Sequence, residues 1–289
     1  MELYQREQRR PTAVVFLFYL KLIIGLIKRK IVMKKVYLFS LLMMTAMIFM
    51  SCTNANKQSS ATDATDSTEV AAADEGWITL FNGTDFTGWR GYNRTDMPSA
   101  WTIEDGAIKI NGSGMGEAGA KDGGDILYDQ KFKNFELTFE WKVSEGGNSG
   151  VFYLAQEIEG RPMYESAPEY QILDNERHPD AKLGKNGNRQ SASLYDLVPA
   201  VPQNAKPAGE WNTGGIMVYK GTVVHSQNGE NVVEYHLWTD DWKEMVANSK
   251  FKDWPNFLNA GGENQEGYIG LQDHGDDVWF RNIKLKVLE

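Results

Sequence analysis

Two short segments hold most of the residues that could carry chemistry in this chain, residues 169–174 and 270–275. In the first, Glu169 and Gln171 alternate with Tyr170 and Ile172, so on a strand the two polar side chains point to one face. A carboxyl group beside an amide on the concave face of a sheet could hydrogen-bond to sugar hydroxyls or transfer a proton. An ordinary polar outer face would show the same alternation.

The second segment places a histidine among carboxylates. His274 follows Asp273 directly, and Asp276 and Asp277 stand just beyond it. Neighbouring carboxylates orient an imidazole for proton transfer. We expect His274 to act as a base or proton shuttle oriented by Asp273, with Glu169 as the rival base. A solvated loop histidine is the alternative.

Several further side chains could bind a sugar. Asn148, in the segment Gly146–Gly150, either faces a ligand or belongs to a plain hairpin turn. Trp211 and Asn212 could stack on a sugar ring and bond its hydroxyls, or Trp211 could be a core residue. Arg281 either binds substrate or locks a bulge in the last strand. The predicted substrate-binding residues are Gln171, Asn148, Asp174, Trp211, Asn212, Tyr195, Gln272 and Arg281.

Other chemistries lack their signatures. The four histidines form no HxH or HxxxH pair, and the acidic loops show no ordered calcium spacing, so we expect no metal site. The glycine-rich stretch 112–124 has no GxGxxG spacing, and no GxSxG elbow occurs. We expect no cofactor. The single cysteine, Cys52, excludes an internal disulfide framework.

Charge divides the chain into two unlike parts. Residues 1–35 carry nine basic and two acidic side chains, and residues 36–51 carry none. The remainder carries 21 basic and 37 acidic residues. A body of that sign repels a phosphate backbone, so we expect no nucleic-acid partner.

The N-terminal part is typical of a bacterial lipoprotein. Residues 33–51 combine a basic head with an apolar run too short for a comfortable membrane span, and Cys52 follows as the expected lipidation site. Residues 1–32 do not fit this scheme and read as an over-extended gene start, with a genuine membrane anchor as the rival. Residues 52–75 are rich in Ser, Thr and Ala and predict a flexible tether. By resemblance to lipoproteins, the absence of an acidic residue after Cys52 favours the outer membrane.

Residues 76–289 predict an all-β fold, a two-sheet antiparallel jelly-roll sandwich. Apolar and polar residues alternate over 135–143, and the alternation slips at Arg281-Asn282, which indicates a β-bulge. Asn228-Gly229 between two β-branched runs predicts a hairpin. Only residues 240–257 predict helical turns.

The ordered set of motifs resembles one family. Leu80-Phe81-Asn82-Gly83, Gly147-Asn148-Ser149-Gly150, the segment 169–174, Glu210-Trp211-Asn212, the segment 270–275 and Phe280-Arg281-Asn282-Ile283 are similar to the 3-keto-disaccharide hydrolase domain family. The resemblance implies a concanavalin A-like jelly roll and cleavage of 3-keto-glycosides by elimination after C2 proton abstraction, followed by hydration. It also implies a carbohydrate substrate, supplied in partnership with a sugar 3-dehydrogenase.

Two other functions stay open. A carbohydrate-binding, lectin-like module without catalysis would present the same aromatic and Asn-rich residues, because one fold serves many functions. A structural lipoprotein of an envelope complex is the third possibility.

Overall fold

The computed structural model describes residues 76–116 and 119–289. The predicted over-extended start (1–32), signal peptide (33–51), lipidated Cys52 and tether (52–75) lie outside the described residues, and these assignments stay predictions. Within the part that is described, no helix is long and apolar enough to cross a membrane.

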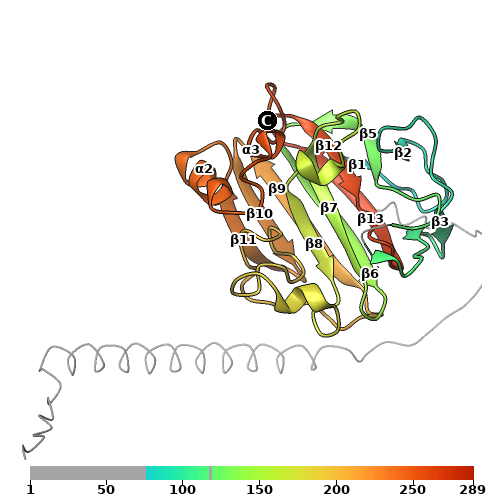
Figure 1. The fold of residues 1–289 in the computed structure, drawn as a ribbon. Coiled ribbons are helices and arrows are strands. Elements are labelled where there is room, and N and C mark those ends of the chain that lie inside the picture. Colours follow the sequence, from blue (N-terminus) through green and yellow to red (C-terminus); the bar gives the residue numbers. More distant parts are fainter. Residues whose placement is uncertain (1–75, 117–118) are drawn as a thin grey trace, which may run out of the picture. The chain divides into compact units, whose positions relative to one another are not determined.

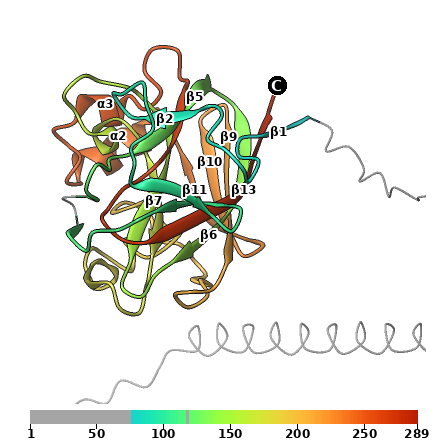
Figure 2. The same cartoon turned by 90° about the vertical axis from the view of Figure 1, so that its right-hand side faces the viewer.

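Two antiparallel sheets form the domain, as predicted (Figures 1 and 2). One sheet has eight strands in the order β11 (Glu230–His236), β10 (Thr222–Gln227), β9 (Asn212–Tyr219), β6 (Phe135–Val143), β13 (Val278–Val287), β4 (Ala107–Ile110) and β3 (Trp101–Glu104), with β1 (Trp77–Thr79) paired to β13. The other has five, in the order β2 (Trp89–Gly91), β5 (Ile126–Phe132), β12 (Gly267–Leu271), β7 (Asn148–Ala155) and β8 (Glu169–Leu173).

The core lies between the two sheets because each strand turns its apolar face inward. In β6, alternate residues from Phe135 to Val143 are buried, and the residues between them are less buried. Tyr170 of β8 meets Phe139 of β6 edge to face, with ring centroids 5.2 Å apart. Since Tyr170 and Ile172 face this core, Glu169 and Gln171 must point out of the opposite face of the five-stranded sheet.

The local features expected from the sequence are confirmed. The register of β13 against β6 shifts between Arg281 and Lys284, and Asn282 adopts a φ of 52° at the bulge. The β10–β11 hairpin turns through Asn228 and Gly229, whose φ angles of 49° and 84° suit a tight hairpin turn.

One local interpretation is wrong. The residues Gly146 and Gly147 do not form a hairpin turn within a sheet, because β6 and β7 belong to different sheets. The segment instead carries the chain from one layer to the other. It places Asn148 at the start of β7, beside β8 and next to the end of β12.

Short helices lie at one end of the sandwich, two of them beside the five-stranded sheet and one against the edge strand β11 of the eight-stranded sheet (Figure 1). They are α2 (Asp240–Ala247), α3 (Pro255–Leu258) and the 3-10 helix η2 (Met163–Glu165), and a further 3-10 helix, η3 (Pro179–Lys182), follows β8. The ring of Tyr164 in η2 lies 5.5 Å from that of Trp254, at the start of α3. The segments around Tyr164 and Trp254 form a wall above the face that carries Glu169 and Gln171.

Candidate active site

A cavity of about 630 Å³ lies on the outer face of the five-stranded sheet. Strands β7 and β8 supply part of its floor, the ends of β5 and β12 supply carboxyl groups, and the segment between α2 and α3 supplies aromatic rings. The lining residues are Tyr92, Gly124, Asp125, Asn148, Pro162, Tyr164, Ala167, Glu169, Gln171, Tyr195, Lys250, Phe251, Trp254, Phe257, Gln272, Asp273 and His274.

Glu169 is a buried carboxyl group in the cavity floor. It is only 7% exposed, and burial raises its pKa to about 8, with the charges of Asp125 and Asp180 adding to the effect and Lys250 opposing it. The Gln171 amide nitrogen donates to Glu169 Oε1 at 2.7 Å when the amide is oriented to face the two acceptors beside it, the other being the Ser149 carbonyl oxygen. At neutral pH Glu169 therefore keeps its proton.

Asp125 is a second carboxyl group in the same cavity, and sequence reasoning missed it. Its Oδ1 atom accepts the backbone N–H of Asp273 at 3.0 Å. Burial of the carboxyl group raises its pKa to about 7, and the charge of Asp273 adds to the rise. Its position directly before the apolar strand β5, at the end of the glycine-rich stretch, was the available signal.

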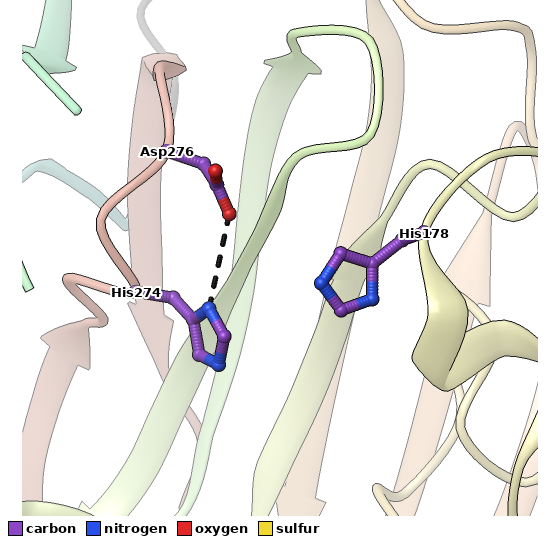
Figure 3. Close-up of side chains that lie close together, drawn as sticks. All are labelled: His178, His274 and Asp276. Atoms are coloured by element: carbon purple, nitrogen blue, oxygen red, sulfur yellow. Dashed lines mark ion pairs between the residues drawn. The ribbon is translucent and has the colours of Figure 1, made fainter. Parts of the chain in front are cut away.

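His274 lines the cavity, and Asp276 is the carboxylate that its ring faces. The Nδ1 atom of His274 lies 3.8 Å from Asp276 Oδ2 (Figure 3). The ring of His178, from the loop after β8, approaches from the other side with centroids 6.0 Å apart. Burial lowers the pKa of His178, and the charge of His274 adds to the effect, so His178 is neutral at neutral pH.

Asp273 has a different task from the predicted one. Its carboxylate accepts the backbone N–H groups of Ala120, Gly124 and Gly275 at 2.7 to 3.1 Å. The predicted role of orienting His274 is therefore not what the geometry shows. Asp273 fastens the end of the glycine-rich stretch to the loop that carries His274 and thereby shapes the cavity wall.

Four of the predicted binding residues lie in the cavity. Asn148 and Gln171 are side by side, with the amide groups 3.1 Å apart. The side-chain oxygen of Gln272 is buried and has no hydrogen-bond partner among the described residues, which makes it an acceptor available to a ligand. Tyr195 donates its hydroxyl to Asp180 at 2.7 Å and packs beneath Lys250, whose Nζ lies 4.2 Å from the ring centroid.

The other four predicted binding residues do not line this cavity. The Arg281 guanidinium lies 3.9 Å over the Trp211 ring and pairs with Glu140 at 2.8 Å, on the outer face of the eight-stranded sheet. Asn212 is buried and accepts from Lys206 N–H and from Asn228. Asp174 accepts backbone N–H groups of residues 146, 176 and 177 and shapes a turn. Each of these side chains contacts neighbouring protein groups outside the cavity.

The fold and the site together define a two-sheet antiparallel β-sandwich that carries ionisable groups in a cavity on the outer face of one sheet. Residues 76–286 match the model of the 3-keto-alpha-glucoside-1,2-lyase-like domain family, and the chain belongs to that family. It is 56% identical over 290 residues to the 3-keto-disaccharide hydrolase of Bacteroides thetaiotaomicron, covering 89% of this chain and 100% of the relative.

Solved structures agree with this assignment. A Parabacteroides distasonis protein assigned as a glycosyl hydrolase is 31% identical with a TM-score of 0.64, over 74% of this chain and 95% of that one. A second protein from the same organism, with the same assignment, is 26% identical with a TM-score of 0.55, over 73% and 99% of the two chains.

Proposed function

We propose that this protein cleaves glycosides whose sugar carries a ketone at C3, by elimination and then hydration. The observation that carries the proposal is the pair of carboxyl groups in one cavity, the buried Glu169 at the start of β8 and the partly buried Asp125 just before β5 of the same sheet. The family match and the relative that is a 3-keto-disaccharide hydrolase support the choice of substrate class.

The reaction needs a base, donors for the enolate oxygen and an acid for the leaving group. A ketone at C3 acidifies the C2 proton, and a base removes it to form an enolate. The enolate expels the C1 substituent, which takes a proton as it leaves, and water then adds to the enone to complete a net hydrolysis. Ordinary glycosidases use two carboxylates at a fixed separation, and this elimination does not require such a pair.

Asp125 and Glu169 divide these two roles by their pKa values. With a pKa of about 7, Asp125 is half ionised at neutral pH and suits the base. Glu169, with a pKa of about 8, is protonated and suits the acid for the leaving oxygen. We therefore propose Glu169 as the acid rather than the rival base expected from the sequence. Asn148, Gln171 and Gln272 bind sugar hydroxyls.

His274 lies in the same cavity, and its role as a base or shuttle stays a prediction. It also approaches His178 and Asp276, with which it forms a cluster of three potential metal ligands.

The test uses full-length protein with a chromogenic 3-keto-glucoside and the unoxidised parent glucoside. We expect release of the chromophore from the keto form alone. Variants Asp125→Asn and Glu169→Gln should lose most of the turnover and keep sugar affinity, because hydroxyl contacts remain. Full turnover in a variant that lacks both Glu169 and His274 would remove these residue assignments.

A non-catalytic, lectin-like function is the alternative, favoured by the aromatic wall of Tyr164, Phe251 and Trp254. Rings of this kind stack on sugars whether or not a reaction follows. Binding of plain sugars with no turnover of either glycoside would support this alternative and contradict the enzyme.

We also propose that Cys52 carries a lipid that anchors the protein to the outer membrane, consistent with the expected signal peptide at 33–51. Mass spectrometry of the mature N-terminus tests the anchor, because a lipidated peptide should begin at Cys52.

Since the substrate is an oxidised sugar, an enzyme that oxidises the C3 hydroxyl must supply it.

A further inference from the structure

We propose that His178, His274 and Asp276 bind a first-row divalent metal ion of the Zn²⁺ class at the edge of the cavity. We further propose that an open position of this ion takes the C3 carbonyl oxygen of the substrate. The first statement stands on the geometry of the three side chains alone. The second rests on the proposed function.

The three donors come from two loops that are far apart in the sequence. His178 follows β8, whereas His274 and Asp276 lie between β12 and β13. One ligand atom from each residue lies within 4.8 Å of the other two, and all three side chains are partly buried. Figure 3 shows the three side chains turned toward one common point.

One donor is already held in place, and another is buried without a partner among the described residues. Asp276 Oδ2 accepts the backbone N–H of Asn148 at 3.1 Å, which orients the carboxylate toward the histidines. His274 Nδ1 is buried and has no hydrogen-bond partner among the residues that the structure describes. Its 3.8 Å separation from Asp276 Oδ2 is too long for a hydrogen bond but suits two ligands of one ion.

The donor set selects the class of metal. Two imidazole nitrogens and one carboxylate oxygen favour Zn²⁺ and its first-row neighbours over Ca²⁺ and Mg²⁺, which prefer oxygen. Bonds of about 2.1 Å place two ligands of a tetrahedral ion ~3.4 Å apart, so the donors must close by roughly 1 Å. Three protein ligands leave at least one position for water or a substrate oxygen.

His178 must exchange its ring proton to take part. Its Nδ1 atom accepts the backbone N–H of Asp180 at 3.1 Å and caps η3, so Nε2 carries the proton of the neutral ring. Binding through Nε2, the nitrogen that Figure 3 shows facing His274, moves the proton to Nδ1 and breaks that cap. Metal binding should therefore speed hydrogen exchange at the Asp180 amide.

The position of the three donors connects them to the reaction. His274 and Asn148 both line the cavity and both approach Asp276, so an ion there borders the space that holds the sugar. A dication beside the C3 carbonyl polarises it and stabilises the enolate formed when the C2 proton leaves.

The experiment titrates EDTA-treated full-length protein with ZnCl₂ alone by calorimetry and records the visible spectrum with CoCl₂. We expect one Zn²⁺ per chain and cobalt absorption bands typical of nitrogen ligation. His274→Gln, His178→Gln and Asp276→Asn should each weaken binding by more than about 100-fold, since even outer-shell partners are worth roughly 10–100-fold.

The chain offers a matched control. His236 Nε2 also lies 3.8 Å from a carboxylate, Glu234 Oε1, but the pair is exposed on β11 and does not belong to the three-donor cluster. His236→Gln and Glu234→Gln should bind Zn²⁺ as the wild type does. Absence of stoichiometric binding by the wild type, or equal affinity in the three site variants, would overturn the metal site.

The two proposals fail separately. Stoichiometric Zn²⁺ binding without cleavage of the keto-glucoside would support the metal site and contradict the proposed function. Cleavage at full rate by EDTA-treated protein would contradict the role of the metal in catalysis and leave the function standing.

Discussion

Gly150 on β7 lies directly against the side chain of Glu169 on β8, so that a Cβ atom at Gly150 would lie 2.7 Å from Glu169 Cγ. The backbone of Gly150 does not have a positive φ, so space and not conformation requires the glycine here. The absence of a side chain at Gly150 allows the carboxyl group to lie on the cavity floor.

The variant Gly150→Ala should therefore displace Glu169 and spare the fold. We expect kcat/KM on the keto-glucoside to fall by about 10–100-fold, since misplacement by ~1 Å can cost that much. Steady-state kinetics and thermal unfolding check the two expectations. In the double variant with Glu169→Gln, Gly150→Ala should cost nothing further, and independent losses would contradict the steric explanation.

The rate should have a bell-shaped pH dependence. Below about pH 7 Asp125 gains a proton and the base is lost, and above about pH 8 Glu169 loses its proton and the acid is lost. The limbs of kcat/KM against pH should fall near these two values. Asp125→Asn should abolish the acidic limb in whatever residual rate remains, and a flat profile from pH 5 to pH 10 would contradict both assignments.

The raised pKa of Glu169 should also make the free energy of unfolding depend on pH. The pKa of Glu169 rises from 4.5 to about 8 on folding, so the folded state favours the protonated form. Wild-type stability is therefore lost as pH rises from 4.5 to about 8. Glu169→Gln should be more stable than the wild type at pH 9 by on the order of 1–3 kcal/mol and equal to it at pH 4. Urea unfolding at the two pH values measures the difference, and equal stability at pH 9 would sink the idea.

Asp273 should prove to be a structural anchor of the cavity wall. Asp273→Ala removes the acceptor of three backbone N–H groups, so we expect destabilisation of about 2–4 kcal/mol. Hydrogen exchange at residues 119–124 should rise. Asp273→Asn keeps one oxygen acceptor and should lose less stability than Asp273→Ala. Equal losses of stability in the two variants would favour the chemical role that the sequence predicts for Asp273.

The two tryptophans Trp211 and Trp254 should behave differently although both are half-buried. Trp254 lines the cavity, and Trp211 lies beneath Arg281 on the other sheet. Trp254→Ala should weaken sugar binding, and Trp211→Ala should leave kcat/KM within about 2-fold while costing roughly 1 kcal/mol of stability. Loss of sugar affinity in Trp211→Ala would restore its predicted binding role.

Most of the fold followed from local patterns. The alternation over 135–143, the slip at Arg281-Asn282 and the Asn228-Gly229 turn each depend on residues that are neighbours in the chain, so the sequence alone was enough to place them. The facing of Glu169 and Gln171 follows from the same period of two. The prediction that Asn148, Gln171, Gln272 and His274 serve one site also agrees with their common cavity.

Only the tertiary structure could assign the remaining residues. Asp125 and His178 became site residues because loops that are far apart in sequence meet at one end of the five-stranded sheet, and no pattern along the chain records that meeting. Asp273 and Asp276 are three residues apart, and their local sequence does not show which of the two carboxylates accepts the hydrogen bonds of the backbone amides. The sequence by itself determined the strands, the faces and the family, because these depend on local alternation and motif order. Burial and long-range contact determined which carboxyl groups hold a proton at neutral pH, because desolvation depends on everything packed around a group.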